Sequence, residues 1–322
     1  MPTVAITRTY PGELNVGAAK LVVGPHEGLQ KPGALAAFVK EHRPDVLISM
    51  YHDRIDGEML DAAGPQLKGV VNFAVGFNNI DLAECAKRKI TVCNTPDAVT
   101  EGTADLAMLL ILAAARMLIP ADRYARSPEY PARGFLAMDD FLGVHLTGQT
   151  LLIVGAGRIG YATAVRTLPW HMRVLYVARS RHLDFEIAPL AAQRVELEEG
   201  LRDADVISIH TPLTPDTRHL INEARLRLLK PNAIVVNTAR GPIIDEGALA
   251  RALKERRLFA AGLDVYENEP TVHPELLGLD NVVLTPHIGS AEEKYRRIMT
   301  GMVGDNARAI LEGRTPPNLL RA

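Results

Sequence analysis

The sequence predicts an α/β fold made of two domains, each built on a parallel β-sheet. Short apolar runs rich in β-branched residues alternate with helical stretches along the chain, and this alternation is typical of βαβ units and parallel sheets. Nearly continuous apolar runs such as IVVN at 234–237 fit strands that are covered on both faces. The chain has 322 residues, which is enough for about two domains.

The apolar runs form two series, and a glycine-rich motif near residue 155 begins the second series in the middle of the chain. We expect strands at 3–7, 45–50, 69–75 and 90–94, and then at 150–156, 173–178, 205–210, 233–239, 260–266 and 281–286. One domain is therefore expected to be inserted into the other, with residues 98–290 inside a domain of 1–97 plus 291–322. The expected crossings are a long helix near 103–119 and the stretch 287–295, and 124–145 is expected to be an irregular excursion.

Composition and charge narrow the class of protein. Hydrophobic residues make up 47%, charged residues 23%, and the formal net charge is −2, so no nucleic-acid or membrane partner is expected. Cys85 and Cys93 are too few for a disulfide framework, which favours the cytoplasm. The longest apolar run, 106–119, contains Arg116 and falls short of the ~20 residues that span a bilayer. No metal site is predicted.

The motif at 155–160 predicts a dinucleotide cofactor. Gly155, Gly157 and Gly160 directly follow an expected strand and open an expected helix. In this pattern the first glycine permits a tight turn, the second lets the backbone approach a pyrophosphate, and the third lets the helix pack closely on the strand. The N–H groups of the first helical turn, around Arg158 and Ile159, then bind the phosphates together with the helix dipole.

The next expected strand ends in VARSRH at 177–182, where an acidic residue normally binds the adenosine ribose. Ala178 stands there instead, followed by Arg179, Ser180 and Arg181. Loss of the carboxylate removes a ribose acceptor and a charge that repels a 2′-phosphate, and guanidinium groups pair well with phosphate oxygens. We therefore expect NADP(H). NAD(H) is the weaker alternative, in which the arginines are only a solvated turn.

Three later strands each end in a candidate catalytic residue. Arg240 follows the strand at 233–239, Asp264 and Glu269 follow the next, and His287 follows the last. The carboxyl ends of parallel strands form the ligand-binding edge of such sheets, so these residues are expected to converge there. Their types suit reduction of a 2-keto acid. Arg240 would bind a carboxylate, and His287 would protonate the carbonyl oxygen, with Glu269 orienting the ring and favouring its charged form.

The chain resembles the D-isomer-specific 2-hydroxyacid dehydrogenase family, and within it the glyoxylate/hydroxypyruvate reductases. The resemblance extends over nearly the whole chain and rests on VGFNNIDL (75–82), TADLAMLLIL (103–112), VGAGRIG (154–160), HTPLTPDTRHLI (210–221), NTARGPIIDEGAL (237–249), GLDVYENEP (262–270), TPHIGSA (285–291) and PPNLL (316–320). It implies two Rossmann-like or flavodoxin-like domains, the central one for the cofactor and the other for the substrate, and a homodimer built on the cofactor domains.

The resemblance also implies roles for single residues. Arg240, Glu269 and His287 would be catalytic, the backbone of Val75 and Gly76 would bind the substrate carboxylate, and Met50 and Tyr51 would face the substrate. The residues expected around the cofactor are Thr103, Thr211, Pro212, Thr238, Ala239, Asp264 and Gly289. The segment after Ser127 departs from the family, because it lacks the usual tryptophans; Trp170 is the only one in the chain.

The sequence thus predicts NADPH-dependent reduction of glyoxylate or hydroxypyruvate to glycolate or D-glycerate. Two other functions are compatible with the sequence. One is an NAD-dependent dehydrogenase for another D-2-hydroxy acid. The other is a binding protein that senses a dinucleotide, against which the compact sequence and the ordinary charge argue.

Overall fold

The computed structural model describes residues 1–29 and 31–320, which form two compact units. The central unit runs from Thr100 to Gly289, and it interrupts the discontinuous unit, which consists of Met1–Val99 and the described residues from Ser290 onward. Each unit contains one parallel sheet. The predicted α/β class is confirmed.

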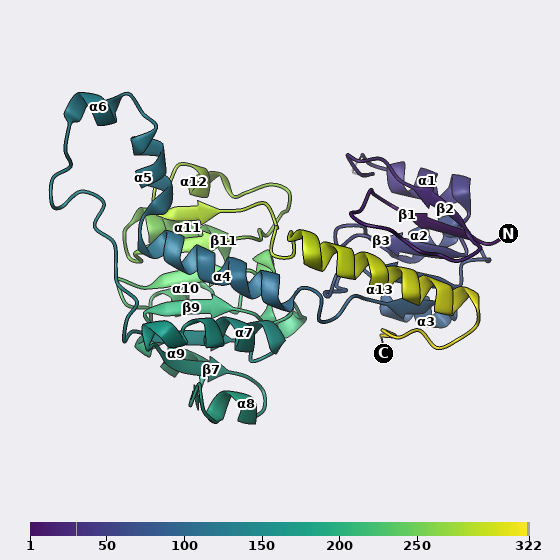
Figure 1. The fold of residues 1–322 in the computed structure, drawn as a ribbon. Coiled ribbons are helices and arrows are strands. Elements are labelled where there is room, and N and C mark those ends of the chain that lie inside the picture. Colours follow the sequence, from purple (N-terminus) through teal and green to yellow (C-terminus); the bar gives the residue numbers. More distant parts are fainter. Residues whose placement is uncertain (30, 321–322) are drawn as a thin grey trace. The chain divides into compact units, whose positions relative to one another are not determined.

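The discontinuous unit has a five-stranded sheet in the order β2-β1-β3-β4-β5 (Figure 1). Its strands are β1 Thr3–Ile6, β2 Lys20–Val23, β3 Val46–Ser49, β4 Gly69–Asn72 and β5 Thr91–Cys93, and its helices are α1 Ala34–His42, α2 Gly57–Ala63, α3 Leu82–Lys87 and α13 Glu293–Leu311. α13 packs closely on β4, because a Cβ on Gly69 would lie 2.6 Å from Ile310 Cδ1. The strand β2 was not predicted; it is a short edge strand of four residues, and all of them are partly or fully exposed.

The central unit has a seven-stranded sheet in the order β12-β11-β10-β9-β6-β7-β8. Its strands are β6 Thr150–Val154, β7 Arg173–Val177, β8 Gln193–Arg194, β9 Val206–Ile209, β10 Ile234–Asn237, β11 Ala260–Leu263 and β12 Val282–Leu284. Alternate residues of β6 enter two separate cores: Leu152 lies in one, and Leu151 and Ile153 lie in the other. The sheet is therefore covered on both faces, as its continuous apolar strands predict.

Helices and short 3-10 turns connect these strands. They are α4 Thr100–Ala115, α5 Leu118–Ala125, α6 Glu129–Arg133, α7 Arg158–Arg166, η1 Leu168–Trp170, α8 Leu183–Glu186, α9 Leu197–Asp203, η2 Pro215–Thr217, α10 Glu223–Leu226, η3 Gly241–Ile243, α11 Glu246–Lys254 and α12 Pro274–Leu277. β10, β11 and β12 end before Arg240, Glu269 and His287, respectively. These three residues therefore lie on loops at the carboxyl edge of the parallel sheet.

Two expectations for the helical segments need correction. The helix expected at 103–119 ends at Ala115, because Met117 adopts a left-handed conformation with φ 49° and starts the separate helix α5. The excursion at 124–145 is not wholly irregular, since it contains the end of α5 and all of α6, which project from the central unit (Figure 1). In the described part of the chain no single helix is long and apolar enough to cross a membrane; α4 and α5 meet that criterion only as a pair, bent by 67°.

Candidate active site

The glycine loop after β6 has the shape that a dinucleotide requires. Gly155 has φ 107°, and a Cβ there would lie 2.6 Å from the Thr211 backbone nitrogen, so only glycine fits. A Cβ on Gly160 would lie 2.3 Å from Gly155 O, which reflects close packing of α7 on the loop. At Gly157, by contrast, the position of a Cβ has no described atom within 4 Å. The two tight positions and the open one between them fit a pyrophosphate against the start of α7.

Arg158 and Ile159 occupy the first two positions of α7, next to Gly157. Across the sheet edge, Thr211 and Pro212 follow β9, and Thr238 and Ala239 follow β10. The Thr238 hydroxyl is buried and has no hydrogen-bond partner among the described residues. A buried hydroxyl without a partner is unusual in a folded protein, and a bound cofactor would supply the missing acceptor or donor.

The turn after β7, residues 178–181, is held by contacts with residues that were not predicted. Arg179 and Ser180 are exposed. Arg181 is not directed to solvent alone, because its Nε lies 3.0 Å from Glu186 Oε2 and it forms an ion pair with that carboxylate. Hydrogen bonds from Arg181 and from the Tyr176 hydroxyl hold the pKa of Glu186 at about 2. Arg181 would thus have to share its charge between Glu186 and a phosphate.

Arg194 of β8 is a second residue missing from the expected set. Its Nε donates to Ala178 O (3.0 Å), and its Nη2 lies 3.3 Å from Arg179 O. These bonds fix the backbone of the turn and add a third positive charge beside it. Nothing in the local pattern indicates this role, because β8 is two residues long and Arg194 lies sixteen residues after Ala178.

His287 and Glu269 form a hydrogen-bonded pair at the carboxyl edge of the sheet. His287 Nδ1 lies 2.8 Å from Glu269 Oε2, and the Tyr266 N–H donates to Glu269 Oε1 at 3.1 Å. Burial opposes ionisation of Glu269, but the hydrogen bond and positive charge of His287, the Tyr266 N–H and the charge of Arg240 outweigh it and keep the pKa of Glu269 below its usual value. The hydrogen bond with Glu269 involves Nδ1 and not the other ring nitrogen, Nε2.

Asp264 shapes the turn that carries His287. Its buried carboxylate accepts hydrogen bonds from the Ile288 and Gly289 N–H groups, both at 2.8 Å, and from Thr285 Oγ1 at 2.6 Å. Burial raises the pKa of Asp264, and these three bonds oppose that shift. His287 has φ 56°, a left-handed conformation that costs energy for a residue other than glycine. The turn around Asp264 holds it in place.

Thr103 closes the other side of this turn. The Thr103 hydroxyl donates to Gly289 O at 3.2 Å, and a Cβ on Gly289 would lie 3.2 Å from Asp264 Oδ2. Gly289 therefore contacts two of the other residues expected around the cofactor, Thr103 and Asp264.

Arg240 is fixed by a turn that abuts the Glu269 segment. Asn237 Nδ2 donates to Arg240 O (2.9 Å), and Asn237 Oδ1 accepts from the Ala239 N–H (3.0 Å). A Cβ on Gly241 would lie 1.9 Å from the Tyr266 carbonyl carbon, so this close approach requires glycine. The sheet thereby brings Arg240 to the same edge as Glu269 and His287.

A second acidic side chain, Glu246, lies near the His287–Glu269 pair. Glu246 is only 5% exposed, and burial together with the charges of Glu267 and Glu269 raises its pKa to about 7. Its backbone N–H donates to Glu267 Oε1 (2.9 Å), which also lies 3.0 Å from His219 Nε2. These residues were not predicted, although they lie within the sequence motifs on which the family resemblance rests.

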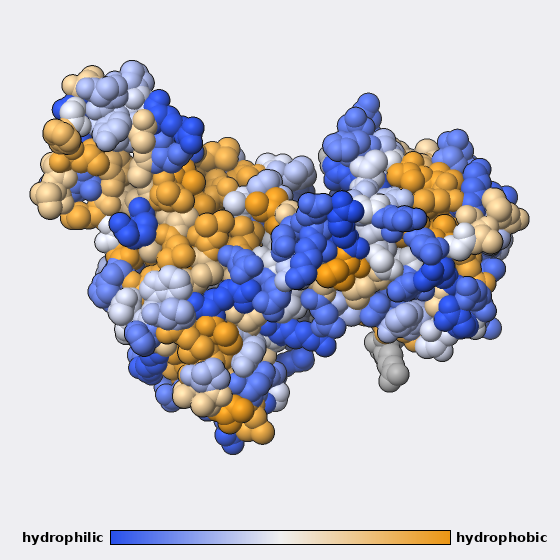
Figure 2. Space-filling model, viewed as in Figure 1, coloured by the Kyte–Doolittle hydropathy of each residue, from blue (hydrophilic) through white to orange (hydrophobic). Residues whose placement is uncertain are grey.

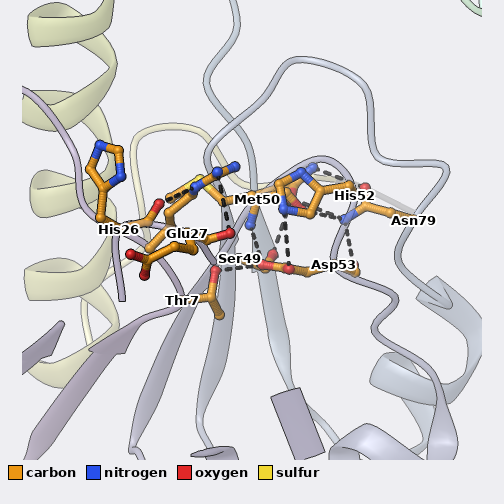
Figure 3. A network of polar contacts seen from close by, with 10 residues as sticks. Thr7, His26, Glu27, Ser49, Met50, His52, Asp53 and Asn79 are labelled. Carbon is orange, nitrogen blue, oxygen red and sulfur yellow. Dashed lines mark hydrogen bonds and ion pairs between the residues drawn. The ribbon is translucent and has the colours of Figure 1, made fainter. Parts of the chain in front are cut away.

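In the discontinuous unit, the expected substrate residues lie on two neighbouring loops. Val75 and Gly76 follow β4, and Met50 and Tyr51 follow β3. Asp53 is 5% exposed and anchors the second loop: its Oδ2 accepts the Met50 N–H at 2.7 Å and the Thr7 hydroxyl (Figure 3). Asp53 therefore fixes the backbone of the loop that carries Met50.

The comparisons with known proteins agree with this geometry. Residues 108–289 match the family model described as D-isomer specific 2-hydroxyacid dehydrogenase, NAD binding domain. The chain belongs to the D-isomer specific 2-hydroxyacid dehydrogenase family. It is therefore an oxidoreductase with a nucleotide-binding Rossmann fold, as the resemblance predicted.

Two curated relatives and two solved structures illustrate the similarity. The chain is 45% identical to a glyoxylate reductase of Thermococcus kodakarensis over 99% of this chain and 96% of that protein, and 48% identical to one of Thermococcus onnurineus over 86% and 82%. It superposes with a TM-score of 0.83 on a glyoxylate reductase from Paecilomyes thermophila (29% identity, 99% and 98% coverage). The TM-score is 0.84 for the NADPH-dependent glyoxylate/hydroxypyruvate reductase of Sinorhizobium meliloti in complex with NADP and malonate (29% identity, 99% and 96% coverage).

Proposed function

We propose that this protein reduces glyoxylate or hydroxypyruvate with NADPH, giving glycolate or D-glycerate. The hydrogen-bonded His287–Glu269 pair at the carboxyl edge of a nucleotide-binding sheet carries the proposal. The similarity to glyoxylate reductases supports the choice of substrate.

The residues of the chain supply the proton and the charge for this reaction. A nicotinamide cofactor held at the glycine loop of Gly155, Gly157 and Gly160 would supply the hydride for the carbonyl carbon, and the electron pair of the C=O π bond would then move to oxygen. His287 Nε2 delivers a proton to that oxygen, which leaves a neutral imidazole. Glu269 holds the ring through Nδ1 and favours its protonated form before the reaction.

Substrate orientation would come from the carboxylate. Arg240 offers planar donors that suit a carboxylate. The Val75 and Gly76 N–H groups donate to no other described residue. They are therefore candidates to donate to a carboxylate.

The cofactor preference rests on the turn at 178–181. No acidic side chain follows β7 there, and Arg179 is exposed while Arg194 braces the backbone. Because Arg181 is paired with Glu186, we assign the larger share of 2′-phosphate binding to Arg179 and Ser180. The NADPH-dependent enzyme of Sinorhizobium meliloti, solved with NADP, supports this preference.

A substrate panel tests the proposed function. Initial rates with glyoxylate, hydroxypyruvate, pyruvate and phenylpyruvate, each with NADPH and NADH, should show the highest kcat/KM for the small keto acids with NADPH. Met50 and Tyr51 are bulky and sit on a loop anchored by Asp53, so they should limit the volume for an aromatic group. A higher kcat/KM for phenylpyruvate would contradict the assigned substrate. No turnover with any keto acid would instead favour a dinucleotide-sensing protein.

The pairing of His287 with Glu269 predicts the pH dependence of reduction. The hydrogen bond and charge of His287 lower the pKa of Glu269, and the Glu269 carboxylate lies 2.8 Å from His287 Nδ1, where its negative charge attracts a protonated imidazole. Glu269→Gln keeps the shape and removes that charge. The alkaline limb of kcat/KM for reduction should then move to lower pH by about one unit or more. An exposed control, Glu41→Gln, should leave the profile unchanged; an unshifted profile in Glu269→Gln would refute the pairing.

We also propose that the protein is a homodimer formed through the central unit. The segment around α5 and α6 exposes large apolar side chains: Phe135 is 101% exposed, Met138 94% and Leu142 63%. Figure 2 shows apolar residues gathered on this projecting part.

Burial of such an apolar patch against a second copy of the chain would stabilise a dimer. Light scattering should give twice the monomer mass, and Phe135→Ser with Met138→Ser should shift the mass toward that of a monomer; a monomeric unaltered protein would exclude the dimer.

The buried, unpaired thiols of Cys85 and Cys93 support the proposal that this enzyme works in the cytoplasm, where thiols stay reduced.

A further inference from the structure

The loop that follows β4 has an unusual hydrogen-bond pattern. The carbonyl oxygens of three successive residues each accept a hydrogen bond from a residue outside the loop. The donors are the Thr95 N–H to Ala74 O (3.0 Å), Asn94 Nδ2 to Val75 O (2.8 Å) and Asn72 Nδ2 to Gly76 O (2.7 Å). Two of the three are asparagine side chains, and both are buried: Asn72 is 0% and Asn94 7% exposed.

These contacts fix the directions of three N–H groups. In a planar trans peptide the C=O and the following N–H point in opposite directions. Holding the carbonyl oxygens of residues 74–76 therefore orients the N–H groups of Val75, Gly76 and Phe77 away from their carbonyl partners. Within the described part of the chain, none of these three N–H groups donates a hydrogen bond. A hydrogen bond to the carbonyl also polarises its peptide, which strengthens the N–H as a donor.

Asn72 is itself held by a second asparagine. Asn72 and Asn79 exchange amide hydrogen bonds of 3.2 Å in both directions, and the Ser49 hydroxyl donates to Asn72 Oδ1 at 3.0 Å. Asn79 Nδ2 also lies 3.1 Å from Met50 O and 2.9 Å from Asp53 O, as Figure 3 shows. The Val75–Gly76 loop and the Met50 loop are thus joined by one polar network.

We propose that Asn94 and Asn72 are positioning residues of an anion site formed by the Val75, Gly76 and Phe77 N–H groups, which receives the carboxylate of the 2-keto acid. This inference rests on the proposed function. Asn94 acts on the Gly76 N–H, and Asn72 acts on the Phe77 N–H, because each holds the carbonyl of the same peptide unit. Neither side chain needs to touch the substrate.

Two variants of Asn94 test the proposal. Asn94→Ala removes the donor, and Asn94→Asp keeps the shape but places a carboxylate oxygen against Val75 O. In both, KM for glyoxylate and the inhibition constant of oxamate, a carboxylate analogue of the substrate, should rise about tenfold or more, which corresponds to about 1.4 kcal/mol. The kcat should stay within a few-fold, and the Kd of NADPH, measured by fluorescence titration, should not change.

The pH dependence separates positioning from a merely structural role. When the carboxyl group introduced by Asn94→Asp is protonated, its O–H can donate to Val75 O again. The ratio of the KM of this variant to that of the unaltered enzyme should therefore fall as the pH is lowered from about 8 toward about 5 (chosen assay limits, around an aspartate pKa raised from ~4 by burial). The same ratio for Asn94→Ala should stay constant.

Asn15→Asp is the matched control. Asn15 is exposed in the same unit, and its Oδ1 accepts the Gly17 N–H, which an aspartate can also do, so KM should not change. If Asn94→Ala fails to fold, Asn94→Asp and Asn79→Ala decide the question, because Asn79 braces Asn72. Normal KM and oxamate inhibition in folded variants would overturn the proposal. An unaltered enzyme that reduces no keto acid would instead overturn the proposed function.

Discussion

His287→Ala is expected to reduce kcat for glyoxylate reduction by about 10²–10⁴-fold, the usual contribution of a general acid. In the proposed mechanism His287 delivers the proton to the carbonyl oxygen through Nε2, because Glu269 holds its Nδ1 at 2.8 Å. The Kd of NADPH should change by no more than a few-fold, since the phosphates are assigned to the glycine loop before α7. Steady-state rates with a parallel binding titration measure both quantities.

His145→Ala is a suitable control for this variant. His145 is an exposed histidine of the central unit, and its Nε2 lies 3.3 Å from Gln149 Nε2, so its loss should leave turnover unchanged. Near-normal turnover of His287→Ala would remove His287 from the mechanism. A large loss of NADPH binding would show that His287 acts on the cofactor site instead.

Local spacing and sheet topology were enough to predict much of the geometry of the candidate site. The glycine pattern depends on a few neighbouring residues, and its three positions have the shapes that the pattern requires. Arg240, Glu269 and His287 are far apart in sequence, but each follows a strand of one parallel sheet. Because such strands end at one edge, the order of the strands alone predicts that these residues converge.

Contacts to backbone atoms could not be predicted in the same way. The partners of Asn72, Asn94 and Asn237 are loop carbonyl oxygens, which leave no trace in the side-chain pattern. One signal was available: each of these asparagines ends, or directly follows, a buried strand. An asparagine at the carboxyl end of a buried strand has a donor that must be satisfied, and the loop that begins there is the nearest source of an acceptor.

The ion pair between Arg181 and Glu186 was missed for a different reason. Glu186 is five residues from Arg181, but the short helix α8 and the Tyr176 hydroxyl place it against the arginine turn. The sequence shows two arginines where an acid is normally found, and it does not show that a nearby acid occupies one of them. The structure therefore makes the two arginines unequal, with a measurable consequence.

The cofactor preference is expected to be large in the unaltered enzyme and to fall in the double variant Ala178→Asp with Arg179→Leu. A charge-assisted hydrogen bond contributes ~1.5–3 kcal/mol, and 1.4 kcal/mol is about tenfold. NADPH should thus be preferred over NADH by about ten- to several-hundred-fold in kcat/KM. The double variant restores a carboxylate that can accept the ribose hydroxyls, and it removes the exposed Arg179 guanidinium that is proposed to bind the 2′-phosphate. It should therefore lower or reverse the preference for NADPH over NADH. Added salt should weaken NADPH binding more than NADH binding.

The single variants distinguish the two arginines. Arg181 forms an ion pair with Glu186, so only part of its positive charge is available to a phosphate. Arg179→Leu should therefore lower the NADPH preference more than Arg181→Leu. Equal losses would mean that Arg181 leaves Glu186 to bind the phosphate. Equal use of NADPH and NADH by the unaltered enzyme would mean that the turn at 178–181 is only a solvated basic loop, and the NAD-dependent alternative would then hold.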